Sequence, residues 1–475
     1  MSKRAVLLLV LALISTSFEV AAEAAFSSSA VAENTWATKA PMPTARGYLG
    51  VAVVNEKIYA IGGIVLVYQD ASRTESREIG TNEEYDPTTN NWTSKTPMPI
   101  PSSHFATAVY NNKIYCIGGA LNQVYNPATD SWENKTPMPI PKIPGQANVV
   151  NDKIYVFVSS CDGSPNSTLN EVYDPISDSW TLKASMPVGV DGVSAVYENR
   201  IYLIGSYFVG SSLDAKGHII EPHSVPITQV YYPENDSWRS KGALGPSFGV
   251  KSVAITTFGI NAPKKIYVFY NPYGWDVNSF MNQVYDPEKD TWISGASFSI
   301  GRMGFGVAVV NDLLCVIGGL SSTNPSMVSF NQDVITTYLS TVEEYTPFGY
   351  STIPPQVTVT SPQNITYSAS NVSLVFKVNK PATWIGYSLD GEETVSVMGN
   401  MTLSGLSSGL HNVTVYANDT FGNIGESETI TFTVNKPEST SQPEPFPTLP
   451  VVAVSVAVVA VVAVGVLVCW KKRKH

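Results

Sequence analysis

The stretch VAVVNEKIYAIGG, residues 51–63, followed by YDPTTNNW, residues 85–92, contains the pattern on which the fold prediction rests. An apolar run leads to the polar pair Asn55-Glu56, and a second apolar run ends in Gly62-Gly63. Tyr85 then precedes Trp92 by seven residues, with turn-forming residues between them. Short apolar runs separated by tight polar turns predict antiparallel strands. The unit is therefore predicted to contain four short strands.

The same unit recurs along the chain. Apolar strand pairs return at 114–119, 154–158, 201–205, 266–269 and 314–319, and the Tyr/Trp spacing of seven returns at 125/132, 173/180, 231/238 and 285/292. Repeats of about 50 residues are typical of propeller folds. Trp36 has no preceding tyrosine partner and Tyr345 has no following tryptophan. This complementarity predicts that the first strand completes the last sheet, which removes an exposed edge.

The pattern resembles the kelch-repeat family, whose signature is a double glycine after the second strand with a Tyr and a Trp at fixed separation downstream. The resemblance covers residues 34–350 and implies a six-bladed kelch β-propeller. The double glycine is replaced at Val158-Ser159, Gly205-Ser206 and Tyr270-Asn271, so these blades are identified mainly by their Tyr/Trp pairs. Aromatic residues present in every repeat are predicted to pack between blades, because they cannot mark one unique site.

Both ends of the chain carry targeting patterns. Lys3, Arg4, the apolar run 5–14 and Ala22-Glu23-Ala24 predict a signal peptide over residues 1–24. Residues 451–470 are uncharged and long enough for a single transmembrane helix, and the basic residues 471–475 indicate a cytoplasmic tail. The expected location is the cell membrane, single-pass, with the N-terminal part extracellular. Alternatively, residues after 436 form a sorting signal whose span is removed.

A second all-β domain is expected at residues 354–435, where strand-like segments alternate with turns such as Asp390-Gly391. It resembles cysteine-free immunoglobulin-like sandwiches of prokaryotic surface proteins, with Trp384 in the core, and the whole assembly resembles archaeal surface proteins. Residues 436–450 are rich in Pro, Ser and Thr and predict an extended spacer. Candidate glycosylation sequons begin at Asn91, Asn134, Asn166, Asn235, Asn364, Asn371, Asn400, Asn412 and Asn418.

Composition excludes some functions. The net charge of −10 leaves no basic stripe for nucleic acid. The cysteines Cys116, Cys161, Cys315 and Cys469 lie in unrelated contexts, so plain thiols are expected. No metal site or cofactor is predicted, since the propeller carries only His104, His218 and His223 and their spacing supports no ligand set. No catalytic motif is present.

The candidate ligand-binding site is the face that carries the long second-to-third-strand loops, residues 64–82, 207–228, 272–281 and 320–341. Repeat alignment also places three cations at one equivalent position before the innermost strand, where they border the central opening. They are expected either to bind a carboxylate or acidic sugar or to form salt bridges with neighbouring loops. The candidate residues are Arg46, Lys142, Arg302, His104, Tyr207, Tyr273 and Trp275.

The function expected from these features is recognition or adhesion without catalysis, with an extracellular glycan or protein as partner. A carbohydrate-active enzyme, such as an epimerase, lyase or hydrolase, is the first alternative, because two carboxylates can converge from distant loops without a sequence motif. A structural component of the cell envelope is the second. Fold alone does not decide among them.

Overall fold

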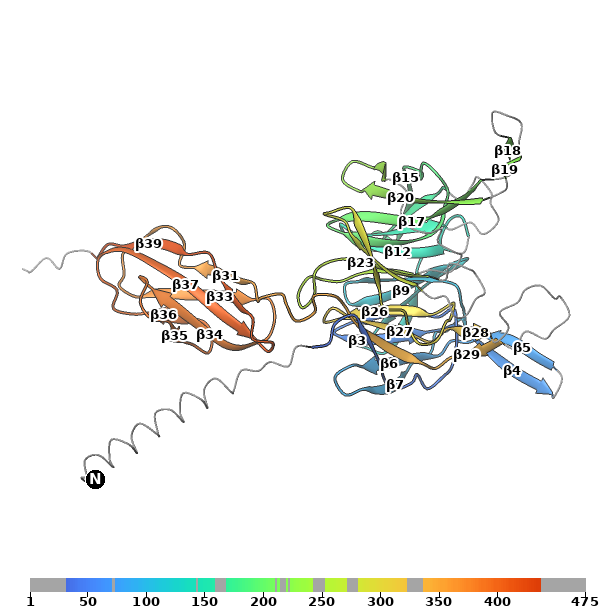
Figure 1. Cartoon of the computed structure of the whole chain (residues 1–475), viewed down its shortest axis with the longest axis horizontal. Helices are drawn as coiled ribbons and strands as arrows, with labels where there is room; N and C mark the ends of the chain where they lie inside the picture. Colours follow the sequence, from blue (N-terminus) through green and yellow to red (C-terminus); the bar gives the residue numbers. More distant parts are fainter. Residues whose placement is uncertain are drawn as a thin grey trace, which may run out of the picture. The chain divides into compact units, whose positions relative to one another are not determined.

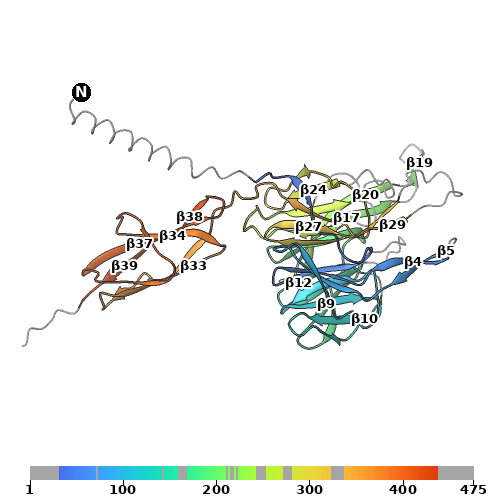
Figure 2. The ribbon, with the colours of Figure 1, turned by 90° about the horizontal axis from the view of Figure 1, so that it is seen from below.

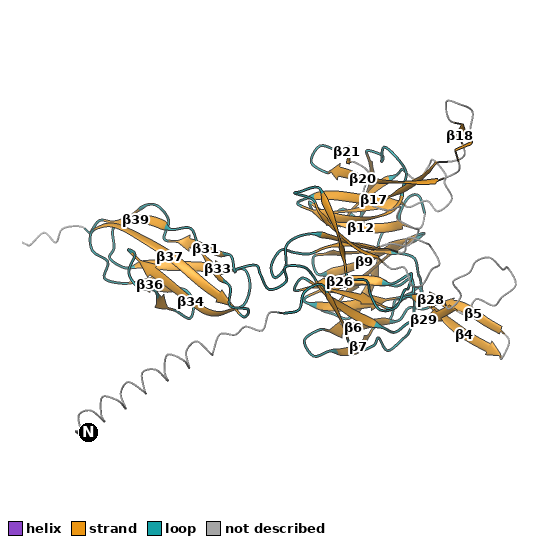
Figure 3. Ribbon diagram, in the orientation of Figure 1, coloured by secondary structure: helices purple, strands orange, loops and turns teal. Residues whose placement is uncertain are grey.

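A computed structural model describes residues 31–70, 73–141, 144–158, 168–209, 212–213, 219–220, 223–241, 253–270, 281–322 and 336–436 (Figure 1). The chain divides into two compact units. The first extends to Gln356 and includes the segments Val378–Trp384 and Ala417–Glu426; the second contains Val357–Lys377, Ile385–Tyr416 and the residues from Ser427. The described residues form strands and loops without an α-helix (Figure 3). None of their elements is a helix able to cross a membrane, and the predicted span 451–470 lies outside them, as does the predicted signal peptide.

The first unit contains six four-stranded antiparallel sheets in its described part, which confirms the expected blades. Blade 1 is β2–β3–β6–β7 (Gly50–Val54, Lys57–Ile61, Asn82–Asp86, Asn91–Lys95), and blade 2 is β8–β9–β10–β11 (Ala106–Tyr110, Lys113–Gly118, Leu121–Asn126, Ser131–Asn134). Blade 3 is β12–β13–β14–β15 (Pro144–Val150, Lys153–Val158, Asn170–Asp174, Ser179–Lys183). Blade 4 is β16–β17–β20–β21 (Asp191–Tyr197, Arg200–Val209, His223–Tyr232, Ser237–Lys241).

Blade 5 is β22–β23–β24–β25 (Val253–Thr256, Ile266–Tyr270, Met281–Asp286, Thr291–Gly295). Blade 6 joins β26, β27 and β30 (Gly306–Val310, Leu313–Ile317, Val342–Thr346) to the first strand, β1 (Thr35–Thr38). Trp36 pairs directly with Tyr345 across β1 and β30. The predicted closure of the last sheet by the first strand is therefore confirmed.

A repeated side-chain clamp joins each blade to its neighbour. In every blade the hydroxyl of the repeat tyrosine donates to an Asn or Asp two residues before the repeat tryptophan, in the pairs Tyr85–Asn90, Tyr125–Asp130, Tyr173–Asp178, Tyr231–Asp236, Tyr285–Asp290 and Tyr345–Asn34. In five blades the same Asn or Asp oxygen also accepts the backbone N–H of one residue of the preceding blade. The carbonyl of this residue in turn accepts the Nε1–H of the repeat tryptophan. These clamped residues are Ala40, Thr96, Thr136, Ala184 and Ala296.

The clamp explains why Asn or Asp occupies this position in every repeat. All six residues have φ between 47° and 55°, in the left-handed region, which Asn and Asp tolerate better than other side chains. Their short side chains also reach the tyrosine and the neighbouring backbone. The tyrosines are completely buried and the tryptophans lie against them, as predicted, with ring centroids 5.1 Å apart for Tyr125 and Trp132. Apolar clusters fill the spaces between consecutive blades.

The two faces of the first unit differ in their loops. Two-residue turns, such as Asn55-Glu56 and Asn311-Asp312, join the first and second strands at one face. At the opposite face three hairpins project on the same side in both views (Figures 1 and 2). They are β4–β5 (Ile64–Asp70, Arg73–Glu78), β18–β19 (Ser212–Leu213, Ile219–Ile220) and β28–β29 (Leu320–Ser322, Thr336–Tyr338). Three of the four predicted long connections therefore share one face, and residues 272–280 of the fourth lie outside the described residues.

The double glycine lets these connections approach the next segment of the ring. Gly63 has φ 103°, and a Cβ there would lie 2.8 Å from the carbonyl oxygen of Gly47. Its N–H donates to the carbonyl of Ser102, which belongs to the segment that enters blade 2. Gly319 makes the equivalent bond to Arg46. Blades 1 and 6 therefore need glycine at this point because a side chain would separate backbones that hydrogen-bond.

The remaining strands form a three-stranded sheet, β31–β33–β36 (Val357–Ser361, Val372–Val378, Met401–Leu403), and a larger sheet. The larger sheet contains β32, β39, β37, β34, β35 and β38 (Thr366–Tyr367, Ile430–Val434, Gly409–Asp419, Ala382–Leu389, Val395–Ser396, Ile424–Glu426). Alternate residues of β33, β37 and β39 are buried, but Trp384, expected in the core, is only half-buried. The immunoglobulin-like assignment stays a prediction.

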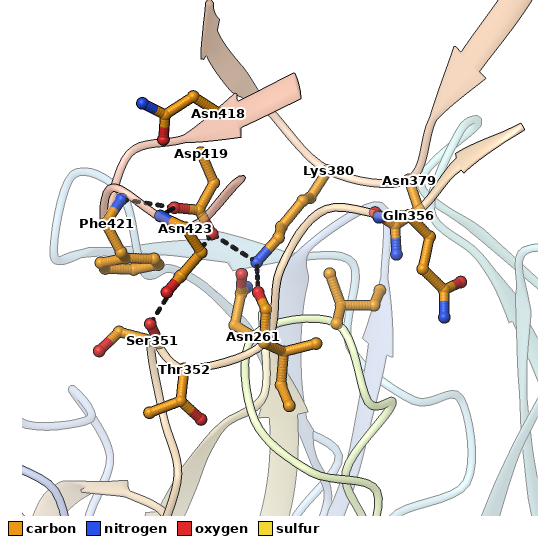
Figure 4. Close-up of polar contacts among 12 residues, drawn as sticks. Asn261, Ser351, Thr352, Gln356, Asn379, Lys380, Asn418, Asp419, Phe421 and Asn423 are labelled. Atoms are coloured by element: carbon orange, nitrogen blue, oxygen red, sulfur yellow. Dashed lines mark hydrogen bonds and ion pairs between the residues drawn. The ribbon is translucent and has the colours of Figure 1, made fainter. Parts of the chain in front are cut away.

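The segment that follows blade 6 is held by polar contacts within the first unit (Figure 4). The buried Lys380 ammonium lies 2.7 Å from the Asp419 carboxylate and also donates to the carbonyl of Ile353. Asn423 donates to both Asp419 and the carbonyl of Ser351. This network satisfies the backbone of an otherwise irregular segment.

We expect Asp130→Ala to lower the free energy of unfolding by about 2–3 kcal/mol, because it leaves the buried Tyr125 hydroxyl and the Thr96 N–H without their acceptor. Asp130→Asn should cost less than about 1 kcal/mol, since asparagine serves the same clamp in blade 1. Urea unfolding of residues 31–436 followed by near-ultraviolet circular dichroism measures both. Equal losses in the two variants would contradict a clamp that depends on the oxygen acceptor.

A second prediction concerns His411. Hydrogen bonds to the Ser407 carbonyl and to Asp390 raise its pKa, because both ring nitrogens face acceptors. The stabilisation should therefore be complete below about pH 6.5 and be lost as pH rises through the higher folded-state pKa. An NMR titration should give a midpoint above about 6.5 that Asp390→Asn lowers. An unchanged midpoint in that variant would show that Asp390 contributes nothing.

Candidate functional site

The candidate site is the set of segments that precede the innermost strands of blades 6, 1 and 2, at the face that carries the hairpins. We call residues 300–305, 44–49 and 100–105 the rim. The rim segments contact the hairpins directly, because Gly47 forms a bridge with Ile64 of β4 and Met303 forms one with Leu320 of β28. The β4–β5 and β28–β29 hairpins therefore form one continuous surface with the rim.

Arg46, a predicted ligand residue, is fully buried in this rim. Its Nη1 lies 2.6 Å from Oε2 of Glu83, and its Nη2 donates to the carbonyl of Ala60 at 2.8 Å. Thr44 donates to the other oxygen of the same carboxylate at 2.7 Å. Burial lowers the pKa of Arg46, while Glu83 acts in the opposite direction. A guanidinium enclosed in this way cannot reach a ligand without losing its partner.

Arg302 repeats the arrangement in blade 6. It is also buried, forms an ion pair with Glu343 and donates to the carbonyl of Thr341 at 3.3 Å. Ser299 donates to the remaining oxygen of Glu343. Both arginines therefore form salt bridges rather than an open ring of cations, but their partners lie on the third strand of the same blade and not in neighbouring loops.

The partner position explains which blades carry a cation. The third strand has Glu83, Gln123, Glu171, Gln229, Gln283 and Glu343 at equivalent places. Where the rim has Arg46 in blade 1 and Arg302 in blade 6, the partner is glutamate. Where blade 2 has Ser102, the equivalent residue is Gln123, which bonds the N–H and carbonyl of Ile100. Charge is thus balanced in blades 1 and 6, and in blade 2 neither residue is charged. Lys142 itself lies outside the described residues.

An aromatic stack occupies the exposed part of the rim. The rings of Tyr48 and His104 lie 4.0 Å apart at an interplanar angle of 22°. The Tyr48 N–H donates to the carbonyl of Gly304 and the His104 N–H to the carbonyl of Tyr48, so three blades are joined in sequence. Gly304 leaves room for the tyrosine, because a Cβ there would lie 2.9 Å from its ring.

Backbone conformation sets this stack apart from its surroundings. Tyr48 and His104 both have φ 54°, which is uncommon for bulky residues and costs energy. His104 is exposed and Tyr48 is half-buried. His104 was among the residues predicted from the sequence, but Tyr48 was not. Tyr48, His104 and Gly304 each lie two residues before the innermost strand of their blade, so aligning the repeats at this position would have identified Tyr48.

Ser103 and Glu78 form a chain of hydrogen bonds with His104. The Ser103 hydroxyl donates to Glu78 at 2.6 Å, and His104 Nδ1 lies 2.8 Å from the same hydroxyl. In a nucleophilic triad the histidine lies between the serine and the acid. Here the serine lies between the other two, and its proton is directed to Glu78. The chain therefore positions His104 and connects the rim to the end of β5.

The other predicted residues have varied positions. Tyr207 is half-buried and packs against the apolar cluster between blades 3 and 4. Tyr273 and Trp275 lie outside the described residues, as does His218. Cys116 and Cys315 are buried free thiols, and no group of three metal-ligating side chains occurs among the residues that the structure describes. The exposed sequon residues are Asn91, Asn134, Asn235, Asn364, Asn371, Asn400 and Asn412; Asn418 is half-buried, and Asn166 is not described.

We expect Arg46→Met to lower the free energy of unfolding by about 3–5 kcal/mol, because it leaves Glu83 buried without a counter-charge. The double variant Arg46→Ser with Glu83→Gln copies the neutral arrangement of blade 2 and should be more stable than Arg46→Met. Urea unfolding of the three chains tests this. A double variant that is no more stable would contradict charge balance as the reason for the pairing.

Comparison with known proteins agrees with the repeat structure. Residues 45–99 match the Kelch motif family. Kelch repeat and BTB domain-containing protein 12 of Homo sapiens is 32% identical over 89 residues, which is 19% of this chain and 14% of that protein. Kelch-like protein terF of Aspergillus terreus is 40% identical over 89 residues, 18% of each chain. The chain spans less than a fifth of the length of these relatives.

Among solved structures, that of YjhT aligns with 62% of this chain and 99% of its own, at 13% identity and a TM-score of 0.42. The matched kelch motif covers blade 1, and the other five sheets are also four-stranded with the repeat tyrosine paired to the repeat tryptophan. The chain therefore contains a kelch motif at residues 45–99, and its described four-stranded sheets have the blade-like arrangement of a β-propeller.

Proposed function

We propose that this protein is a recognition module that binds an extracellular protein or glycan through the rim and its hairpins. The observation that carries the proposal is the exposed stack of Tyr48 and His104, held in a left-handed backbone conformation. Strained residues persist where the surrounding structure holds them, and they cluster at functional sites. Aromatic side chains with a polar tip are also frequent at binding hot spots.

The hairpins extend this surface beyond the rim. Ile64, Val65, Leu66 and Val67 of β4 are half-buried and pair with the exposed Glu78, Arg77, Ser76 and Glu75 of β5. An apolar strand beside a charged strand offers both contact area and polar partners to a macromolecule. Kelch repeats are consistent with a propeller that binds another protein, which supports this choice over catalysis. The Ser103–His104 contact does not favour an enzyme, because its hydrogen-bond order is not that of a nucleophilic site.

The proposed location is the outer surface of a membrane. Its support is the apolar N-terminal run, the uncharged stretch 451–470 and the basic tail. The immunoglobulin-like sandwich would then act as a spacer, and its exposed sequons Asn364, Asn371, Asn400 and Asn412 would be accessible to glycosylation. Membrane fractionation of the full chain tests the location. Recovery with soluble proteins would contradict anchoring.

The recognition role is tested with fluorescently labelled residues 25–436, applied to a glycan array and to intact cells. We expect saturable binding that Tyr48→Asn or His104→Asn weakens at least tenfold, a change of about 1.4 kcal/mol. Asparagine is chosen because it tolerates the left-handed conformation while removing the ring. Asn112→Asp, at a left-handed position of the short-turn face, is the matched control and should bind as the unmodified chain does.

Protease or glycosidase treatment of the cells identifies the class of ligand, because only the enzyme that destroys the ligand abolishes binding. Equal binding by all three variants would place the site away from the rim. Absence of saturable binding to cells and glycans would contradict the recognition role itself.

A further inference from the structure

A cavity of about 260 Å³ lies beside blade 5, near the short turns and away from the rim. Tyr267, Val284 and Ile293 form one wall, since they are directly paired residues on three neighbouring strands and share one face of the blade. Pro263 and Phe348 contribute to the other side. The equivalent region of the other blades has no counterpart of these two residues, because both come from segments that depart from the repeat.

The first of these segments is the connection between β22 and β23. Blade 5 uses residues 257–265 where blades 1 and 6 use two-residue turns. The fully buried Asp312 holds this connection, accepting the backbone N–H groups of Phe258, Ile260, Asn261 and Ala262. A carboxylate with several backbone donors fixes the loop in one conformation. Pro263 is therefore held in place whether or not a ligand is present.

The second segment follows β30. The Ser351 N–H donates to the carbonyl of Asn261 at 2.8 Å, which ties this segment to the loop of blade 5. Gly349 has φ 69°, and a Cβ there would lie 2.8 Å from the Pro263 ring. The Gly349 N–H donates to Glu33. Phe348 itself packs against the apolar cluster between blades 5 and 6, and the residues after it are held by these bonds, so the site is preorganised.

Three charged side chains line the cavity: Lys265, Lys289 and Asp286. The Asp286 carboxylate forms an ion pair with Lys265, and the Lys289 ammonium lies 3.9 Å from the same carboxylate oxygen. Two ammonium groups therefore share one carboxylate. The Lys289 side chain is 76% exposed, so its charge is available to a ligand that enters between the strands and Phe348.

We propose that this cavity binds a small organic carboxylate with an aromatic or branched apolar body. The apolar body would lie between the exposed Ile293 and the half-buried Phe348, and the carboxylate would bind Lys289. Ligand sites are concave and mostly apolar, with a few polar groups that orient the ligand. A volume below the roughly 300–1,000 Å³ of drug-sized sites limits the ligand to a smaller molecule.

The test is a methyl NMR titration of residues 25–436 with phenylacetate and with its neutral match, phenylacetamide, following the Ile293 and Val284 methyl groups. We expect saturable shifts at millimolar phenylacetate and at least threefold weaker binding of the amide. Lys289→Glu should weaken phenylacetate binding at least fivefold, because it replaces attraction by repulsion. Lys183→Glu, an exposed lysine of blade 3, is the matched control and should leave binding unchanged.

Absence of a saturable methyl shift with either compound would overturn the site. Equal binding of acid and amide, or a Lys289→Glu variant that binds as well as the control, would overturn the assignment to a carboxylate. The proposal is independent of the rim. Tyr48→Asn should therefore bind phenylacetate as the unmodified chain does, and a failure at one site leaves the other testable.

Discussion

The interaction on which the ring depends is the clamp between consecutive blades. A single oxygen of Asn or Asp accepts both a buried tyrosine hydroxyl and a backbone N–H of the preceding blade, and the adjacent tryptophan bonds the carbonyl of that same residue. The irregular backbone between two blades would otherwise leave polar groups unpaired near a packed interface, which is costly. The clamp satisfies these groups and determines the spacing of neighbouring sheets. Closure uses the same contacts, because Ala296 of blade 5 is bonded by Trp36 of the first strand and by Asn34, which directly precedes that strand.

Much of this architecture could be predicted from the sequence because it is repeated. Tyrosine and tryptophan recur at constant separation, and the unmatched Trp36 and Tyr345 indicate which strands must meet. The asparagine or aspartate of the clamp is equally regular, but its role depends on a left-handed φ and on a backbone N–H that lies 34 to 52 residues away in blades 1 to 4. Neither the distant N–H nor the backbone conformation can be recognised in the sequence, where the Asn or Asp resembles any other turn-forming residue.

The candidate site was harder to predict because its chemistry depends on burial. Arg46 and Arg302 occupy a position that borders the central opening, and from sequence alone an arginine there is equally suited to a ligand or to a salt bridge. The structure shows each beside a glutamate on the third strand of its own blade. Comparing Glu83 with Gln123 across the repeats reveals the same dependence, because a buried carboxylate needs a cation and an amide does not.

Buried ion pairs and the exposed stack are parts of one arrangement. Arg46 is two residues from Tyr48, and its buried side chain holds the rim segment 44–49 from inside. The backbone of that segment is also bonded, at Arg46 by Gly319 and at Gly47 by Ile64. A segment held at so many points can keep Tyr48 and His104 in a conformation that neither would adopt in a free loop. Rigid placement lowers the entropy lost when a partner binds. In the proposed recognition role, the arginines would therefore keep the aromatic rings in position rather than contact the ligand themselves.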